Sequence, residues 1–248
     1  MQKSYLTICS AVIVLFLLIS PVLGSEGYKE INTIELKKWM DAEDKPILVN
    51  SLSPIEFGES YIPGSISIPM ELMQVSQLIP EDLNVPVIFY CYGPDCMKSK
   101  TAADIAIKMG HQNVYWYREG LNGWKTAGYP TQYNLQLPEE PLPPKEPSEL
   151  FKLLQNKEEI ILIDIRDEVT RKKLGRISGV TIHLPLYRLH NLYRELPRNK
   201  LLVVYDSKGQ QSSTACRYLF QRHFEKVTWL KGGIEAWTKA KLPVKFSN

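Results

Sequence analysis

The stretch NVYWYREGLNGWKTAGYP at residues 113–130 returns later in the chain as KVTWLKGGIEAWTKAKLP at residues 226–243. In both stretches an apolar run leads through a glycine-containing turn into a segment that carries a tryptophan. The matched positions keep a constant offset, so that Gly120, Trp124 and Pro130 correspond to Gly233, Trp237 and Pro243. Similarity of this kind indicates a duplicated domain.

The repeat continues upstream of these stretches. Three further pairs of segments match: KPILVNS with EIILIDI (45–51 and 159–165), YIPGSISIP with GRISGVTIHLP (61–69 and 175–185), and PVIFYC with LLVVYD (86–91 and 201–206). Between the copies lies the proline-rich segment LPEEPLPPKEPSE, which favours a stiff, extended connection. We therefore predict a first domain at residues 25–135, a linker at 136–148 and a second domain at 149–248.

The order of elements within each copy indicates the fold class. Short apolar strands such as ILVN, VIFY and VYWY alternate with helix-like segments such as TAADIAIKMG. This alternation predicts an α/β fold in which each copy forms a mainly parallel sheet covered by helices on both faces. Trp124 and Trp237 fall on the last helix of their copies, where we expect them to pack in the core.

Composition argues against several classes of function. The 248 residues are 44% hydrophobic and 23% charged with a net charge of +3, which suits a globular protein of one or two domains. The basic run RKKLGR at 171–176 has no interleaved aromatic residues, so we expect a solvated face and no nucleic-acid partner. The four histidines are scattered, and we expect neither a metal site nor a cofactor.

The N-terminus has the pattern of a signal peptide. Lys3 precedes the apolar run AVIVLFLLI at 11–19, and small residues follow up to Gly24. We predict a signal peptide at residues 1–24, cleaved after Gly24, and a periplasmic or secreted protein. The alternative is an uncleaved membrane anchor, although the apolar run is short for a bilayer span. Export would place the remaining cysteines where disulfides persist.

The chemistry is concentrated in the stretch FYCYGPDCMKS at residues 89–99. Cys91 ends a predicted strand, and ligands bind beyond the carboxyl ends of parallel strands. The loop then enters a helix, for which Ser99 is the expected N-cap. Unpaired backbone N–H groups and the helix dipole lower the pKa of a thiol in such a loop, and Lys98 adds positive charge nearby. We therefore expect Cys91 to be a reactive nucleophile.

Taken together, these motifs make the mature chain resemble two tandem rhodanese domains, the sulfurtransferase fold. The resemblance rests on Cys91 at its strand end and on the segments IPGSISIP (62–69), LIDIRDE (162–168) and GGIEAW (232–237). It implies that Cys91 takes sulfane sulfur from a thiosulfate-like donor, becomes a persulfide and passes the sulfur to a small thiol or a protein acceptor. It also implies that the loop residues Gly93, Lys98 and Ser99 bind the substrate, with Lys98 nearest to the arginine that the family often carries.

The second copy departs from the family pattern at the position of the nucleophile. Asp206 stands where the first copy has Cys91, and a carboxylate cannot carry a persulfide, so we expect the second domain to be inactive. The second copy keeps the family's Asp-x-Arg pattern as Asp164 and Arg166, which we interpret as structural. The first copy has Asn50 and Leu52 there instead.

Two further cysteines leave alternatives open. Cys96 belongs to the part of the first loop that the second copy lacks, and it is a candidate second thiol that resolves the persulfide or receives its sulfur. The alternatives are that Cys91 and Cys96 form a redox pair or a static disulfide, or that both copies are non-catalytic binding modules. A phosphatase is disfavoured because Met97 occupies its arginine position, and Cys216 is expected to be a buried apolar residue.

Overall fold

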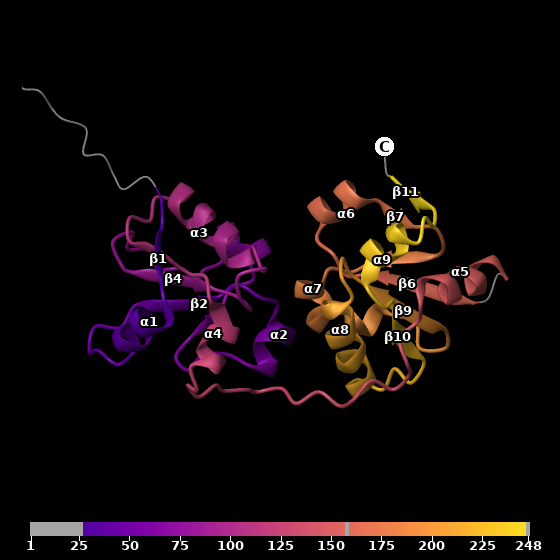
Figure 1. Ribbon diagram of the computed structural model, residues 1–248, viewed down its shortest axis with the longest axis horizontal. Helices are drawn as coiled ribbons and strands as arrows, with labels where there is room; N and C mark the ends of the chain where they lie inside the picture. The colour runs from indigo at the N-terminus through magenta and orange to yellow at the C-terminus, as the bar shows by residue number, and fades with distance from the viewer. Residues whose placement is uncertain (1–26, 157–158, 247–248) are drawn as a thin grey trace, which may run out of the picture.

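The computed structural model describes residues 27–156 and 159–246. The predicted signal peptide at 1–24 and its cleavage site therefore lie outside the described residues. Within the described ranges, no helix combines the length and apolar character needed to cross a membrane. Figure 1 shows two lobes, one from each half of the chain, joined by an extended segment.

The first domain is built on a five-stranded sheet in the order β1-β5-β4-β2-β3, with all neighbouring strands parallel. Its strands are β1 (Lys29–Ile31), β2 (Ile47–Asn50), β3 (Ile66–Ser67), β4 (Val87–Tyr90) and β5 (Val114–Tyr117). Its helices are α1 (Thr33–Met40), α2 (Pro54–Glu59), the 3₁₀ helix η1 (Met70–Val75), α3 (Lys98–Lys108) and α4 (Gly120–Thr126). The middle strand, β4, is the strand that ends before Cys91.

Side chains of β4 alternate between two cores, one on each face of this sheet. Phe89 packs in a cluster with the alanines of α3, whereas Ile88 and Tyr90 pack with residues of α1 and α4. Because neighbouring side chains of a strand point to opposite faces, the continuous apolar run VIFY fits a strand covered on both sides. Helices thus cover both faces of the sheet, as predicted.

The second domain repeats this plan with a four-stranded parallel sheet in the order β10-β9-β6-β8 and a two-stranded antiparallel pair, β11 with β7. Its strands are β6 (Ile160–Asp164), β7 (Arg176–Ile177), β8 (Thr181–His183), β9 (Leu201–Tyr205), β10 (Val227–Trp229) and β11 (Val244–Lys245). Its helices are α5 (Pro147–Gln155), α6 (Glu168–Leu174), α7 (Leu186–Leu192), η2 (Tyr193–Glu195), α8 (Gln210–Gln221) and α9 (Gly233–Lys239). The sheet again carries a buried cluster on each face.

The matched tryptophans have the same structural role in both domains. Trp124 and Trp237 are buried, which confirms their predicted place in the core. Each indole N–H donates a hydrogen bond to the carbonyl of the matched proline, Pro130 at 2.8 Å and Pro243 at 3.0 Å. The bond ties the last helix of each copy to the chain that leaves it.

The matched glycines are required where the last helix begins. Gly120 and Gly233 have φ angles of +59° and +58°, a region that favours glycine. A β-carbon at Gly120 would collide with the carbonyl of Cys91, and one at Gly233 would collide with the carbonyl of Asp206. The glycine turn therefore lets the backbone pass directly against the residue that ends the neighbouring strand.

Helix α2 of the first domain packs against α7 and α8 of the second, the two lobes facing each other in Figure 1. Ile55 of α2 belongs to a core cluster of the second domain. The Glu59 carboxylate pairs with Arg217 at 2.9 Å and accepts a hydrogen bond from Thr214 at 3.2 Å. Apolar and ionic contacts thus join the two copies.

Candidate active site

Cys91 lies immediately after β4, at the predicted strand end, but its side chain is only 1% exposed. Its thiol donates a hydrogen bond to the carbonyl oxygen of Cys96 at 2.9 Å and lies 3.1 Å from the hydroxyl of Ser99. The loop after the strand therefore folds back over the sulfur, because the turn at Gly93 lets the Cys96 N–H donate to the Gly93 carbonyl at 2.9 Å. The sulfur is placed as expected but covered.

Ser99 does not cap the following helix, so the predicted N-cap role is wrong. Helix α3 begins at Lys98 and its N-cap residue is Met97, whose side chain makes no capping hydrogen bond to the first turn. The reason is that the Ser99 hydroxyl is engaged elsewhere, by the Cys91 sulfur and by the indole N–H of Trp116 at 3.0 Å. Since an indole N–H can only donate, the Ser99 oxygen accepts from it and its own proton is free to point at the sulfur.

The surroundings of the Cys91 sulfur lower the pKa of its thiol. Burial acts to raise the pKa of the Cys91 thiol. Contacts with the Cys96 side chain, the Ser99 hydroxyl and the backbone of Ser99 and Gly93 outweigh this effect and lower the pKa to about 7. The pKa of Cys96 is raised, first by its contact with Cys91 and then by burial. Cys91 is therefore the member of the pair that carries thiolate near neutral pH.

The third described cysteine takes no part in this site. Cys216 is fully buried in α8 within a core cluster of the second domain, as expected. Burial raises the pKa of its thiol to about 12. Cys91, Cys96 and Cys216 are all free thiols in the described chain.

Lys98 is an ion-pair partner as well as a loop residue. Its ammonium group lies 2.7 Å from the carboxylate of Glu71 in η1, and both side chains are largely buried. Burial acts to lower the pKa of Lys98, but Glu71 and other nearby acidic groups raise it above its usual value. Lys98 is thus a cation, and its charge is already balanced by Glu71.

A cleft of about 580 Å³ lies between the two domains at this point. One wall is the loop at residues 92–98, which includes the predicted substrate-binding residues Gly93 and Lys98, and the other comes from the second domain at residues 206–211. Of the three described cysteines, Cys96 lines the cleft, and Cys91 and Cys216 do not. The cleft therefore brings together the strand-end loops of both copies, with Cys91 behind the nearer wall.

Asp206 fills the cradle that its own loop forms. Its buried carboxylate accepts hydrogen bonds from the backbone N–H groups of Gly209 and Gln211, the second at 2.7 Å, and from the hydroxyl of Ser212 at 3.1 Å. Burial raises the pKa of Asp206, while these bonds act to lower it. Ser212 contacts Asp206 as Ser99 contacts Cys91, so the two strand-end positions correspond in space as they do in sequence.

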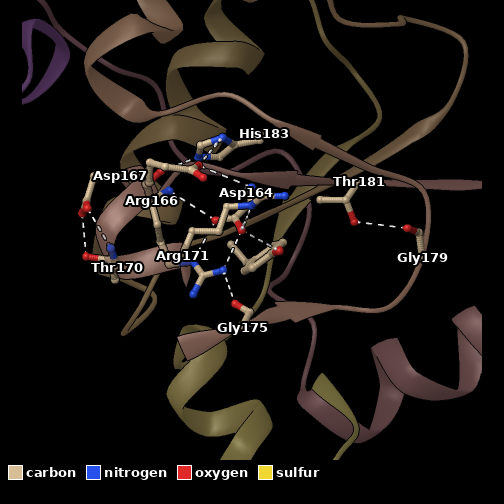
Figure 2. A network of polar contacts seen from close by, with 11 residues as sticks. Asp164, Arg166, Asp167, Thr170, Arg171, Gly175, Gly179, Thr181 and His183 are labelled. Atoms are coloured by element: carbon tan, nitrogen blue, oxygen red, sulfur yellow. Dashed lines mark hydrogen bonds and ion pairs between the residues drawn. The ribbon is translucent and has the colours of Figure 1, made fainter. Parts of the chain in front are cut away.

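The Asp-x-Arg pair of the second domain forms a buried polar network (Figure 2). The guanidinium of Arg166 donates two bonds to the Asp164 carboxylate, at 2.8 and 2.6 Å, and a third to the carbonyl of Gly175 at 2.8 Å. The hydroxyl of Tyr205 donates to the same carboxylate at 2.8 Å. The pair therefore ties β6, β9 and the segment before β7 together, in line with a structural role.

The first domain makes a neutral version of this arrangement. The Asn50 side chain accepts a hydrogen bond from the backbone N–H of Leu52 at 2.9 Å, and Leu52, which matches Arg166 in the repeat, is buried. Tyr90, the counterpart of Tyr205, accepts the N–H of Ile62 at 3.0 Å and bonds to Ser65 at 2.8 Å. The strand end before Cys91 is thus ordered without the ion pair.

Sequence reasoning missed several residues of this site. Trp116, which orients Ser99, is signalled only by its match with Trp229 in the repeat. Glu56 lines the cleft and accepts a bond from Gln211 across the domain boundary at 2.9 Å. No local pattern announces such a bond, because its partners are far apart in the chain and belong to different copies.

These features define an α/β protein with an activated thiol at the end of its central strand. The family model of the rhodanese-like domain matches the chain twice, at residues 32–127 and 146–240. The two matches cover more than half of the chain, and the chain belongs to the rhodanese-like domain family as a tandem protein.

Curated relatives with sulfurtransferase names match one domain's length of this chain. A sulfurtransferase of Allochromatium vinosum is 33% identical over 95 residues, which span 38% of this chain and 87% of that protein. The thiosulfate sulfurtransferase GlpE of Glaesserella parasuis is 31% identical over 99 residues, which span 40% of this chain and 89% of that protein. Both likenesses place the chain among rhodanese-like sulfurtransferases.

A solved structure overlaps both domains more loosely. The thiosulfate sulfurtransferase of Pseudomonas aeruginosa covers 89% of this chain with a TM-score of 0.44 and 17% sequence identity. This chain spans 44% of that protein. The likeness is weak and adds nothing on function.

Proposed function

We propose that the first domain is a sulfurtransferase that moves sulfane sulfur from a thiosulfate-like donor to a thiol acceptor through a persulfide on Cys91. The observation that carries this proposal is the environment of the Cys91 sulfur. The thiol directly follows the central strand, its pKa is lowered to about 7, and the Ser99 hydroxyl lies 3.1 Å away. A thiolate populated near neutral pH is the form that attacks sulfane sulfur.

The proposed reaction has two displacement steps. The Cys91 thiolate attacks the outer sulfur of thiosulfate, the donor's sulfur–sulfur bond breaks, and sulfite leaves with the bonding electrons. The thiolate of the acceptor then attacks the outer sulfur of the Cys91 persulfide, and Cys91 leaves as thiolate. Ser99 and the backbone of Gly93 stabilise the negative charge that Cys91 carries before the first step and regains in the second.

The buried position of Cys91 implies that the loop moves during turnover. The Cys96 carbonyl lies 2.9 Å from the sulfur and accepts its proton, so a thiolate would face an oxygen lone pair there. Loss of the proton therefore favours movement of the Cys96 peptide away from the sulfur. We infer that the donor reaches Cys91 when the segment at residues 92–97 shifts.

The second domain has a non-catalytic role in this proposal. Asp206 occupies the nucleophile position, and its carboxylate already takes the donors of its loop. The same loop contributes a wall of the cleft. The second domain would thus shape the space in which the acceptor binds to the first domain.

Export is a separate proposal, which rests on the signal-peptide pattern at residues 1–24. Cell fractionation followed by N-terminal sequencing tests it. Recovery outside the cytoplasm of a chain that begins at Ser25 would support cleavage after Gly24. A membrane-bound chain that keeps Lys3 would favour the uncleaved anchor, and a cytoplasmic chain that keeps Lys3 would contradict export.

Turnover tests the proposed activity. We expect sulfite release from thiosulfate in the presence of a small thiol, and a loss of about a thousandfold or more in Cys91→Ser. Cys216→Ala is the matched control, since it removes a buried thiol in α8, and it should keep the wild-type rate. A Cys91→Ser protein that retained the wild-type rate would refute the proposal.

A further inference from the structure

We propose that Cys96 is a second sulfur carrier, which takes the sulfane sulfur from Cys91 and presents it to the acceptor in the cleft between the domains. This inference rests on the proposed persulfide of Cys91. It assigns the two thiols of the loop different tasks in one reaction: Cys91 takes sulfur from the donor and Cys96 hands it on.

Cys96 is accessible from the cleft, whereas Cys91 is not. Cys91 is 1% exposed and lies behind the loop, whereas Cys96 is half-buried and lines the cleft of about 580 Å³. An acceptor thiol that enters this space meets the Cys96 side chain first. Since the facing wall comes from the second domain, a sulfur on Cys96 would be displayed to both domains, while one on Cys91 would not.

The Cys91 sulfur is closely surrounded by the loop. Contacts at 2.9 Å to the Cys96 carbonyl and 3.1 Å to the Ser99 hydroxyl leave no space for another sulfur atom on the same side. A persulfide on Cys91 therefore displaces the Cys96 peptide. The peptide that is displaced belongs to Cys96 itself, so the outer sulfur emerges next to that residue.

The two copies of the repeat differ in the length of this loop. The second domain passes from Asp206 to the first residue of its helix, Gln210, whereas the first domain needs the longer path from Cys91 to Lys98. Cys96 stands in this added length, and the added length forms the wall of the cleft. The insertion therefore brings a thiol into the cleft that the shorter loop of the second domain does not provide.

The transfer step balances without any further reagent. The Cys96 sulfur attacks the outer sulfur of the Cys91 persulfide, so that one sulfur–sulfur bond forms at Cys96 and the bond to Cys91 breaks. Cys91 leaves with the electron pair, and the proton released by Cys96 returns to the Cys91 site. Cys91 is the better leaving group of the pair, because the Ser99 hydroxyl 3.1 Å from its sulfur and the backbone of Gly93 stabilise its thiolate.

The sequence allows the two carriers to be separated by one digestion. A protease that cleaves before aspartate cuts ahead of Asp95, so Cys91 and Cys96 fall on different peptides. The reduced full chain would be incubated with thiosulfate, quenched in denaturant with iodoacetamide and digested. We expect extra sulfur on both peptides of the wild type, only on the Cys91 peptide of Cys96→Ser, and on neither peptide of Cys91→Ser.

Kinetics of the same variants give a second readout. In Cys96→Ser, the first burst of sulfite should persist, because donor attack needs only Cys91. The steady-state transfer to an acceptor thiol should fall about tenfold or more, and Cys216→Ala should behave like the wild type. A steady-state rate in Cys96→Ser equal to that of the wild type would overturn the relay.

The outcomes also separate the relay from the proposed function. Wild-type sulfur confined to the Cys91 peptide overturns the relay and leaves the sulfurtransferase proposal standing. A Cys91–Cys96 cross-link formed with release of sulfide also overturns it, since Cys96 would then have attacked the inner sulfur. Sulfur on neither peptide overturns both proposals.

Discussion

At the scale of single residues, the reactivity of the site depends on which group holds the proton next to Cys91. Ser99 accepts the indole N–H of Trp116 at 3.0 Å, which leaves its own O–H to donate to the sulfur. A serine in this orientation stabilises a thiolate more than a thiol. The second domain keeps the serine, as Ser212, but there it donates to a carboxylate.

The pH dependence of the thiolate tests this role of Ser99. Cys91 should ionise with a midpoint near its pKa of about 7, so thiolate and activity should rise with pH and level off above it. Ser99→Ala removes the donor, and the midpoint should move up by about one pH unit. The measurement is the ultraviolet absorbance of the thiolate, taken as the difference from Cys91→Ser in the same background. An unchanged midpoint in Ser99→Ala would show that the hydroxyl does not stabilise the thiolate.

At the scale of elements, the two copies stabilise the corresponding strand ends with different side chains. β6 uses the buried pair of Asp164 and Arg166, while β2 ends in Asn50 followed by the buried Leu52. A buried ion pair often contributes little more than an apolar replacement, but removal of one partner leaves a buried charge unpaired. The first copy is therefore a natural example of the replacement.

Transfer of the first copy's residues into the second tests that interpretation. Asp164→Asn alone should lower the free energy of unfolding by about 3 kcal/mol, because Arg166 loses its partner. The double variant Asp164→Asn/Arg166→Leu should recover most of that loss. Urea denaturation followed by tryptophan fluorescence measures both. A double variant no more stable than the single one would mean that the guanidinium is needed for its bond to Gly175.

Elements were largely predictable from sequence, whereas the geometry of the loop was not. Apolar runs such as VIFY and the matched glycine turns predict the strands, the parallel sheets and the position of Cys91, because these depend on local periodicity. The N-cap prediction for Ser99 failed because a tertiary contact with Cys91 and Trp116 competes with the local capping preference. The covering of Cys91 by the Cys96 carbonyl depends on the same loop geometry and has no signature in the sequence.

At the scale of the whole molecule, duplication produces two unequal copies around one cleft. Contacts from α2 to α8 hold the strand-end loops opposite each other, with Glu59 pairing with Arg217 and Glu56 with Gln211. The repeat predicts two domains of the same fold, but it cannot predict which faces pack together. The division of labour proposed for the copies depends on that packing.

Charge reversal at the interface tests the contribution of the second domain. Arg217→Glu would place an acid opposite Glu59, so we expect the domains to separate and the KM for the acceptor thiol to rise severalfold. Small-angle scattering and steady-state kinetics measure the two effects. Lys226→Glu, at an exposed position of the same domain, makes the same charge change and should alter neither. Unchanged kinetics in a separated Arg217→Glu protein would show that the second domain does not shape the site.

Intact mass spectrometry of the reduced full chain after incubation with thiosulfate tests the central claim most directly. The account predicts a gain of one sulfur atom in Cys96→Ser, of one or two in the wild type because Cys91 is reloaded after transfer to Cys96, and no gain in Cys91→Ser. A sulfur gain that survives in Cys91→Ser, or a wild-type chain that gains none, would contradict the assignment of Cys91 as the residue that receives the sulfur.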